Sequence, residues 1–550
     1  GGFVSPTITR EFWRANMTET VVDHLVARFR ELGVVRMFGV PGGGSSLDLI
    51  ESAGRAGIEF VLCRTETAAA FMAAVSAELT GVPGVVLTGI GPGAASVVNG
   101  IAYASLERVP LILITDAGEM EATLSPHQFF DQQAVFAPIT KGTLRLNSKN
   151  AGSILDTLIQ STCIDPCGPV HLDLTVKSAR ARILQGSDSD DLMLTEEPLD
   201  FEKSLSDITQ FISDSHRPVL IVGLQARRSG VCEKLYKLVE HIGCPVLTSY
   251  KAKGAMPEDN PYFVGLFTGA NAEAATLSKA DFILTLGLDP IELIPVPWGY
   301  AAPVGVVMQG PSDAFPFAPA VHLEGDLAVN IEHLTGLEFE SDWRLDEIEN
   351  LRELMRDTTS VRGVGHTADS IVDALWNAAP SGTRLAVDAG AHMFSAMARW
   401  PAARPHDVLK SNGLSTMGFA LPAAIASYLT DPGRPVIALT GDGGMLMCLA
   451  ELSTAARLKI PVVVVVLNDA ALSLIDIKQQ RLQHPVNGVR YPPVDFAQAA
   501  KGLGCQTWSI DANQSIEDIL PAVFSADGPT VIDVTTDPSG YGNQLAAIRE

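Results

Sequence analysis

Short hydrophobic runs alternate with amphipathic stretches along most of the chain, and the alternation occurs three times. This pattern is typical of buried parallel strands connected by helices. The predicted strands are 37–40, 60–62, 84–88, 111–115 and 170–174, then 217–223, 245–248, 282–286 and 304–307, then 385–388, 436–440, 462–467 and 530–534. We therefore expect an α/β fold with three doubly wound parallel-sheet domains.

Polar segments without this pattern mark the predicted boundaries. An acidic stretch at 185–198 reads as a linker, and a charged stretch after 337 reads as a helical connector. The predicted organisation is an N-terminal extension 1–16, a first domain 17–184, a central domain 199–337, a connector 338–365 and a third domain 366–550. The first domain should open with an amphipathic helix at 18–32. The outer two domains are expected to be related folds.

The third domain contains an acidic glycine turn between two hydrophobic runs. Asp442 follows the first run within Gly441-Asp442-Gly443-Gly444, and Asp469 follows the second run. Glycine lets a backbone approach a ligand closely, and the first N–H groups of a helix bind phosphate. Because both acidic residues follow parallel strands, they should meet at one edge of the sheet. Carboxylates and phosphate oxygens suit Mg²⁺, with the backbone carbonyl near Ala471 completing the set, so the pattern predicts a metal-bound diphosphate.

A purely structural interpretation of this segment is also open. The glycines could form an ordinary strand-to-helix turn, and Asp469 could cap a helix. The intervening helix should run from Met445 to Leu458, with one face formed by Leu446, Leu449, Leu452 and Ala456.

A second candidate contact with diphosphate follows the strand 385–388. Gly390 and Ala391 offer backbone groups there, and His392 offers an imidazole. A single histidine is equally compatible with a structural role.

Composition limits the class of protein. The chain has 550 residues and a formal net charge of −24, which argues against nucleic acid or an anionic membrane as a partner. The seven cysteines are dispersed and odd in number, so they predict neither a disulfide framework nor a zinc site. No hydrophobic run reaches the length of a membrane span, and residues 1–16 lack the core of a signal peptide. We expect a cytoplasmic protein with no membrane partner.

Eight further sequence blocks support a specific resemblance. They are Val40-Pro41-Gly42-Gly43, Arg64-Thr65-Glu66, Thr88-Gly89-Ile90-Gly91-Pro92-Gly93-Ala94, His127-Gln128, Ile139-Thr140-Lys141, Gly168-Pro169-Val170, Thr248-Ser249-Tyr250-Lys251-Ala252-Lys253-Gly254 and Met417-Gly418-Phe419-Ala420-Leu421-Pro422-Ala423-Ala424. With the acidic turn, they resemble the acetohydroxyacid (acetolactate) synthase and 2-oxo acid decarboxylase family of thiamine diphosphate enzymes. That family has pyrimidine-binding, central and diphosphate-binding domains in this order. One departure is Asn468-Asp469, where the family usually shows Asn-Asn.

The resemblance implies roles for individual residues. Glu66, after the strand 60–62 that we expect to be buried, corresponds to the carboxyl group that hydrogen-bonds the aminopyrimidine and gives access to its basic imino tautomer. A helix-start carboxylate is the structural alternative. Met417 corresponds to the apolar residue that holds the cofactor bent. The other implied cofactor contacts are Pro92, Gly390, Ala391, His392, Gly413, Thr416, Gly441, Gly443, Gly444 and Asn468.

The substrate is less constrained by the resemblance. Gln128 corresponds to a synthase glutamine that faces the reacting intermediate, which makes it a catalytic candidate. None of the 11 histidines neighbours another, unlike the adjacent pair of many pyruvate decarboxylases. Lys478 stands where biosynthetic synthases have a tryptophan that selects the acceptor, and Ser96 replaces their asparagine. The implied substrate contacts are Gly42, Gly43, Gln128, Ile475 and Lys478.

The central domain departs from the synthase pattern. Synthases of this type usually hold a structural FAD through an arginine after the strand that corresponds to 282–286. Here Gly287-Leu288-Asp289-Pro290 follows, and an acidic residue would repel a dinucleotide, so FAD is doubtful. Arg227 and Arg228 are a weak signal in the opposite direction.

The resemblance thus implies a Mg²⁺- and thiamine diphosphate-dependent carboligase that decarboxylates pyruvate or a related 2-oxo acid. The alternatives are a decarboxylase or C–C lyase of the benzoylformate decarboxylase or benzaldehyde lyase type, and a cofactor-binding protein without turnover. In the family, the pyrimidine domain of one subunit faces the diphosphate domain of another. A homodimer or homotetramer is therefore implied, with Glu66 and Asp442 of one site contributed by different chains.

Overall fold

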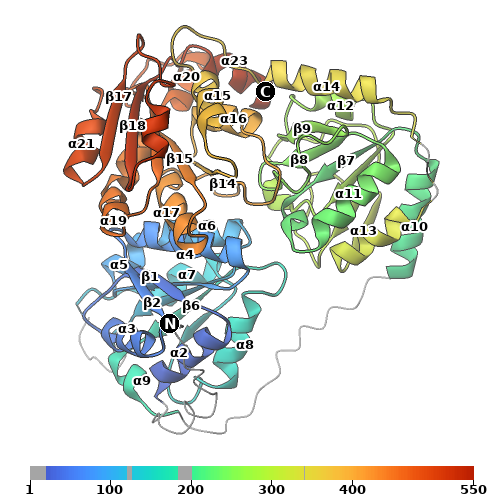
Figure 1. Cartoon of the computed structure of the whole chain (residues 1–550). Coiled ribbons are helices and arrows are strands. Elements are labelled where there is room, and N and C mark those ends of the chain that lie inside the picture. Colours follow the sequence, from blue (N-terminus) through green and yellow to red (C-terminus); the bar gives the residue numbers. More distant parts are fainter. Residues whose placement is uncertain (1–19, 120–126, 184–200, 338, 340, 550) are drawn as a thin grey trace, which may run out of the picture. The chain divides into compact units, whose positions relative to one another are not determined.

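The computed structural model describes residues 20–119, 127–183, 201–337, 339 and 341–549. The chain divides into two compact units, residues 1–193 and 194–550 (Figure 1). The first unit contains one sheet and the second contains two. The predicted N-terminal extension and the acidic linker lie outside the described residues. The predicted domain boundaries stay predictions, although each sheet falls within one of the three predicted ranges.

Each sheet has six strands, and every pairing between named strands is parallel, which confirms the predicted fold class. The first sheet, in the order β2-β1-β3-β4-β6-β5, comprises β1 (Arg36–Val40), β2 (Glu59–Leu62), β3 (Gly84–Thr88), β4 (Leu111–Asp116), β5 (Thr143–Arg145) and β6 (Pro169–Leu174).

The third sheet has the same arrangement as the first. Its order β14-β13-β15-β16-β18-β17 repeats that of the first sheet when its strands are numbered along the chain, as expected for related folds. Its strands are β13 (Arg384–Val387), β14 (Val408–Lys410), β15 (Val436–Gly441), β16 (Val463–Asn468), β17 (Gln506–Ile510) and β18 (Thr530–Thr535).

The central sheet differs from both. Its order β12-β11-β10-β7-β8-β9 is the order 3-2-1-4-5-6 of dinucleotide-binding folds read from the other edge. Its strands are β7 (Pro218–Val222), β8 (Val246–Ser249), β9 (Phe263–Phe267), β10 (Phe282–Leu286), β11 (Val304–Met308) and β12 (Val321–Glu324).

Helices flank each sheet. In the first unit they are α2 (Val21–Glu31), α3 (Ser45–Arg55), α4 (Glu66–Thr80), α5 (Pro92–Ser96), α6 (Val98–Leu106), α7 (Gln132–Phe136), α8 (Ser153–Ser161) and α9 (Val176–Arg180). In the second unit they are α10 (Phe201–Asp214), α11 (Val231–Ile242), α12 (Ala274–Leu277), α13 (Leu327–Thr335), α14 (Leu345–Thr358), α15 (Ala368–Ala378), α16 (Ala391–Arg399), α17 (Ala420–Thr430), α18 (Asp442–Cys448), α19 (Leu452–Arg457), α20 (Ser473–Arg481), α21 (Phe496–Gly502), α22 (Leu520–Phe524) and α23 (Tyr541–Arg549).

The cores follow from the hydrophobic pattern. In the first unit, Leu25 of α2 and Leu49 of α3 pack with Ile112 of β4 in one buried cluster. In the third domain, Met397 of α16 and Leu545 of α23 belong to a similar cluster. No helix within the described ranges is long and apolar enough to cross a membrane.

The predicted helix Met445–Leu458 is wrong in two respects. α18 already begins at Asp442, and a 3₁₀ turn, Leu449–Glu451, separates it from α19. The tighter turn changes the helical phase, so Leu446 is 44% exposed whereas Leu452 is buried. The predicted face through Leu446, Leu449, Leu452 and Ala456 is therefore not continuous.

Of the predicted connector 338–365, the structure describes 339 and 341–365, and within these residues α14 is the only helix. The structure also contains strands that we did not predict, namely β5, β9, β12, β14 and β17. All five are edge strands of their sheets, where shorter and more polar strands are common.

Candidate active site

A glycine-rich turn after β3 contacts two of the predicted catalytic residues of the first unit. A side-chain carbon on Gly91 would lie 2.4 Å from the carbonyl oxygen of Gln128, and one on Gly93 would lie 3.3 Å from Oε1 of Glu66. Gly91 also has φ +65°, which favours glycine. The turn therefore holds Glu66 and Gln128 at opposite ends of one short segment.

Glu66 is the first residue of α4. The hydroxyl oxygen of Thr65 caps this helix by accepting from the N–H of Ala68. β2, which precedes it, is an edge strand in which only Val61 is buried, so the expectation of a buried strand before Glu66 is wrong. The carboxyl group instead owes its half-buried position to the turn at Gly93. This position also suits the alternative in which Glu66 only stabilises the helix, because a carboxylate in the first turn interacts favourably with the helix dipole.

Asp116, at the end of β4, organises the loop that carries Gly42 and Gly43. Its Oδ1 accepts from the N–H of Ser46 at 2.6 Å and from the hydroxyl of Ser45 at 2.7 Å. A side-chain carbon on Gly42 would lie 2.2 Å from Asp116 Oδ2, whereas Gly43 faces open space. Sequence reasoning missed Asp116, although its place at the end of a hydrophobic run was an available signal.

Gln132 ties the glycine-rich turn to the sheet. Its Oε1 accepts from the Gly91 N–H at 3.1 Å, and its amide donates to Thr115 and to Asp173 Oδ1. Pro92 follows directly as the first residue of α5. This buried network therefore fixes the segment that separates Glu66 from Gln128.

In the second unit, Asp442 and Asp469 follow neighbouring strands, because β15 pairs with β16 up to Gly441 opposite Leu467. Asp442 Oδ1 accepts from the Gly443 N–H at 2.7 Å and from the hydroxyl of Tyr491 at 2.8 Å. Asp469 Oδ2 accepts from the hydroxyl of Ser473 at 2.5 Å. The predicted strand, turn and strand thus bring both carboxylates to one edge.

The pair fits a divalent cation. Oδ2 of Asp442 is buried and has no hydrogen-bond partner among the described residues. Burial raises the pKa of Asp469 to about 6, with Ser473 opposing the shift and the Asp442 carboxylate adding to it. A cation would relieve this repulsion. The part of the chain that the structure describes has no group of three or more His, Cys, Asp or Glu suited to a metal, so phosphate and backbone oxygens would have to complete the shell.

Asp388, which follows β13, holds the loop that carries Met417. Its carboxylate accepts from the N–H groups of Gly418 and Phe419 and from the hydroxyl of Thr440, at 2.9 to 3.1 Å. Burial raises the pKa of Asp388 to about 6. The methyl carbon of Met417 lies 3.2 Å from where a side-chain carbon on Gly443 would be. The structure therefore places Met417 beside the acidic glycine turn.

The predicted residues Gly390, Ala391 and His392 form the start of α16. The His392 ring lies against Gly390 and Gly441, and its Nε2 is buried without a partner among the described residues. Burial lowers the pKa of His392 to about 4, so the imidazole is neutral and brings no charge to a diphosphate.

Three further predicted cofactor contacts of this unit, Gly413, Thr416 and Asn468, lie on two different segments of the chain. Gly413 and Thr416 belong to the loop before α17, where the Thr416 N–H donates to Ser411 Oγ at 3.1 Å. The Asn468 amide nitrogen donates to Val494 O and Asp533 Oδ1, which leaves its oxygen for a ligand.

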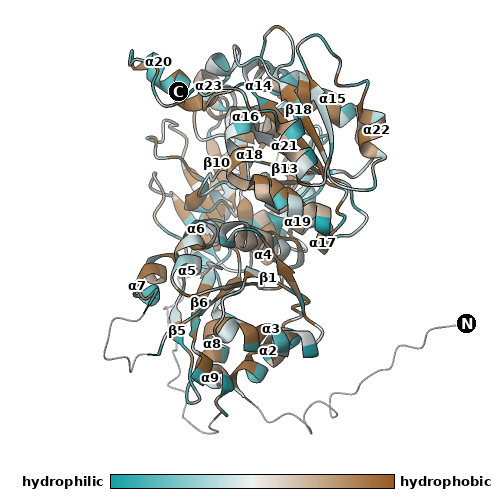
Figure 2. Ribbon diagram, turned by 90° about the vertical axis from the view of Figure 1, so that its left-hand side faces the viewer, coloured by the Kyte–Doolittle hydropathy of each residue, from teal (hydrophilic) through white to brown (hydrophobic). Residues whose placement is uncertain are grey.

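The remaining predicted contacts of the second unit lie on or beside α20. Ala471 forms an isolated bridge with Arg490 just before this helix. Ile475 and Lys478 are exposed on it, and Figure 2 shows α20 as largely hydrophilic.

In dinucleotide-binding folds the ligand lies at the carboxyl ends of the two central strands, and here protein groups meet at the corresponding ends of β7 and β10. Glu292 Oε2 accepts from the N–H groups of Leu224 and Asp289, at 2.8 and 3.1 Å, where the loops after β7 and β10 meet. Its other oxygen accepts from Ser249. Gly223 and Leu288 approach so closely that a side-chain carbon on Gly223 would lie 2.1 Å from Leu288 Cα. The residues at these strand ends do not fit an anionic dinucleotide such as FAD.

Comparisons with known families agree with this arrangement. Three domain models of the thiamine pyrophosphate enzymes match in order: the N-terminal TPP-binding domain at 19–136, the central domain at 205–299 and the C-terminal TPP-binding domain at 388–534. Together they match most of the chain.

Whole-length relatives carry related names. The chain is 29% identical to the acetolactate synthase of Bacillus subtilis (strain 168), over 95% of this chain and 93% of that protein. It is 26% identical to the acetolactate synthase isozyme 2 large subunit of Escherichia coli (strain K12), over 93% and 95%. It is 28% identical to a probable 2-ketoarginine decarboxylase of Pseudomonas aeruginosa, over 96% of each. The chain therefore belongs to the thiamine pyrophosphate enzyme family, as a thiamine diphosphate-dependent enzyme of the acetolactate synthase and 2-oxo acid decarboxylase branch.

Proposed function

We propose that this enzyme decarboxylates a 2-oxo acid, pyruvate in the first instance, and joins the product to a second carbonyl compound, as an acetolactate synthase does. The observation that carries the proposal is the carboxylate pair Asp442 and Asp469, with one buried and unpartnered oxygen at the start of α18. Asp442, Asp469 and the carbonyl of Ala471 would hold Mg²⁺, and the N–H group of Gly444 would face the diphosphate, while that of Gly443 donates to Asp442.

The first unit would supply the acid–base and substrate groups. Bound thiamine diphosphate supplies the thiazolium that stabilises a carbanion. Glu66 would hold a proton at the pyrimidine ring, which requires a carboxyl group in a fixed position. The contact of Gly93 with Glu66 provides that position. Gln128 would orient the substrate, supported by the rigid network through Gln132.

Product analysis tests this proposal. The purified enzyme, loaded with thiamine diphosphate and Mg²⁺, is incubated with pyruvate alone and with pyruvate plus 2-oxobutanoate, glyoxylate or benzaldehyde, and products are identified by mass. Acetolactate or a mixed acyloin supports carboligation. An aldehyde as the only product from every mixture contradicts it and favours simple decarboxylation.

The second candidate is a decarboxylase of larger 2-oxo acids, or a C–C lyase of the benzoylformate decarboxylase or benzaldehyde lyase type. The likeness to a probable 2-ketoarginine decarboxylase along 96% of both chains supports it. Exposed Lys478 on α20 offers a charge that a polar substrate could meet. A panel of 2-oxo acids with basic, acidic and aromatic side chains, assayed for CO₂ release without an acceptor, separates this candidate from the first.

A cofactor-binding protein without turnover is the remote alternative. Such a protein would have no use for Glu66 in addition to the acidic pair, and any CO₂ release above that of the cofactor alone contradicts this alternative. We also propose that the enzyme is a homodimer or homotetramer and that it is cytoplasmic.

The position of Glu292 supports the doubt about FAD, because its carboxyl group is hydrogen-bonded where the loops after β7 and β10 meet.

A further inference from the structure

A cavity of about 430 Å³ lies within the second unit, away from the predicted cofactor residues. β9 and α14 form one side of it, and α15 and the end of α16 form the other. α16 begins at Ala391, beside the predicted diphosphate contacts, and ends at Arg399 in the cavity. Because a helix rises about 1.5 Å per residue, Ala391 and Arg399 lie about 12 Å apart along this helix.

The cavity wall is positively charged although the chain has a net charge of −24. Four basic side chains line it, against the acidic pair Glu258 and Asp373. Three of the four are committed to the protein. Lys253 pairs with Glu258, the Arg352 guanidinium donates to two backbone carbonyls, and Arg399 pairs with Asp373.

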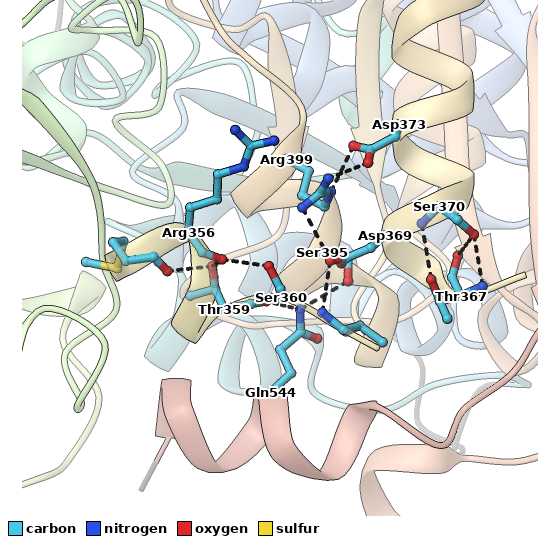
Figure 3. A network of polar contacts seen from close by, with 12 residues as sticks. Arg356, Thr359, Ser360, Thr367, Asp369, Ser370, Asp373, Ser395, Arg399 and Gln544 are labelled. Atoms are coloured by element: carbon cyan, nitrogen blue, oxygen red, sulfur yellow. Dashed lines mark hydrogen bonds and ion pairs between the residues drawn. The ribbon is translucent and has the colours of Figure 1, made fainter. Parts of the chain in front are cut away.

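Arg356 is the exception. Within the described ranges its guanidinium has no hydrogen-bond or ion-pair partner, while its backbone carbonyl accepts from Thr359 and Ser360. In Figure 3 the side chain extends from the end of α14 to the side of the network where Arg399 lies. A guanidinium that lines a cavity with all five donors available is suited to a carboxylate or phosphate.

The neighbouring Arg399 is held in place by a polar network. Its guanidinium donates to Asp373 Oδ1 at 2.8 Å and lies 3.4 Å from Asp369 Oδ2. The Gln544 amide joins the same region by donating to the Thr359 carbonyl at 2.7 Å and to Ser395 Oγ at 3.1 Å (Figure 3). A fixed positive group therefore lines the same cavity as the unpartnered one.

Most of the other side chains of the wall are apolar or aromatic. Tyr250, Phe263, Trp376 and Phe394 line the cavity together with methionine side chains. Trp376 is 43% exposed, and its ring is fixed by an edge contact with Trp400 at 5.1 Å. A volume of this size and such a wall are typical of sites for small organic molecules. We propose that the cavity binds a small anionic ligand with an aromatic or similarly flat apolar body, its carboxylate or phosphate held by Arg356.

Calorimetry with matched probes tests the proposal on the full-length enzyme loaded with thiamine diphosphate and Mg²⁺. The probes are 2-naphthoate, 2-naphthyl phosphate and the neutral 2-naphthamide. At least one anionic probe should bind, and Arg356→Gln should weaken its binding about tenfold or more, because a charge-assisted contact is lost. The stronger anionic probe shows whether the natural ligand carries a carboxylate or a phosphate.

Arg344→Gln is the matched control, since Arg344 precedes the same helix, is 76% exposed and does not line the cavity. It should leave probe affinity unchanged. Trp376→Ala should weaken both the anionic and the neutral probe. The proposal is overturned if neither anionic probe binds, if 2-naphthamide binds as tightly as the anions, or if Arg356→Gln leaves the anionic affinities as they are in the Arg344→Gln control.

Discussion

The phenolic hydroxyl of Tyr491 donates a hydrogen bond of 2.8 Å to Oδ1 of Asp442. The Tyr491 N–H also donates to the carbonyl of Ala470, so the residue joins the loop after β16 to the first turn of α18. With Oδ1 engaged in this way, Oδ2 of Asp442 is the oxygen that stays buried and unpartnered within the described part of the chain. Tyr491 is thus placed to orient Asp442, the proposed metal ligand.

Tyr491→Phe should weaken Mg²⁺ binding about tenfold, since loss of a hydrogen bond to a metal ligand typically costs 10- to 100-fold in affinity. Titration of Mg²⁺ into enzyme saturated with thiamine diphosphate measures this by calorimetry. Tyr300→Phe removes a hydroxyl that donates to Ala270 in the central domain and should have no effect. Equal Mg²⁺ affinity in both variants would show that Tyr491 does not orient Asp442.

Asp442→Ala should abolish Mg²⁺-dependent binding of thiamine diphosphate. The diphosphate would lose its charge bridge in a protein with a net charge of −24. Calorimetry with the cofactor, in the presence and absence of Mg²⁺, checks this. Asp518→Ala, which removes an equal charge from an exposed position, should bind normally. Unchanged cofactor affinity in Asp442→Ala would sink the assignment of the metal site.

The parts of the site that could be predicted are those whose residues lie close together in the sequence. Asp442 and Asp469 lie one strand–helix–strand unit apart, so local spacing was enough to bring them together. Strands β15 and β16 were also predictable from local sequence, because each is a hydrophobic run rich in β-branched residues. The 3₁₀ turn between α18 and α19, which lies between the buried residues Cys448 and Leu452, carries no glycine or proline that would have predicted it.

The residues that were missed act across the fold. Asp388 binds Gly418 and Phe419, and Asp116 binds Ser46, over separations of 30, 31 and 70 residues. Glu292 accepts a hydrogen bond from the N–H of Leu224, which is 68 residues away in the sequence. An acidic residue at the end of a hydrophobic run signals a polar role, but its partner follows only from the strand order.

Glu292 should make stability depend on pH. Burial raises its pKa from 4.5 to about 7 in the folded protein. The folded state therefore holds the proton more strongly than the unfolded state, so the contribution of Glu292 to stability is fully present below pH 4.5 and is lost as the pH rises through about 7. Glu292→Gln removes this loss, so its stability relative to wild type should be higher at pH 8 than at pH 4.5, by about 3 kcal/mol.

Thermal melting from pH 4.5 to 8 measures the effect. The exposed Glu353→Gln on α14 is the control and should follow the wild-type profile. Parallel profiles for wild type and Glu292→Gln would mean that the buried carboxyl titrates normally.

Mixed dimers test the proposed assembly. Glu66→Gln and Asp442→Ala are each expected to be inactive alone. If a site combines Glu66 of one chain with Asp442 of another, co-expression yields heterodimers in which one of the two sites keeps both residues. Purification through two different tags should then recover about half the wild-type activity per dimer. A heterodimer as inactive as its parents would place both residues of a site in one chain, and an active monomer by light scattering would exclude the assembly.

Glu66→Gln alone separates binding from chemistry. The proposed diphosphate and metal contacts belong to the third domain, so thiamine diphosphate and Mg²⁺ should bind with nearly unchanged affinity. General acid–base groups typically contribute about 10²- to 10⁴-fold, so turnover should fall by that order. Hydrogen–deuterium exchange at thiazolium C2, followed by NMR in the loaded enzyme, should slow by a similar factor. Glu59→Gln changes an exposed carboxylate of β2 and should leave both rates intact. Wild-type exchange in fully loaded Glu66→Gln enzyme would remove Glu66 from the mechanism and leave it as a residue that stabilises the start of α4.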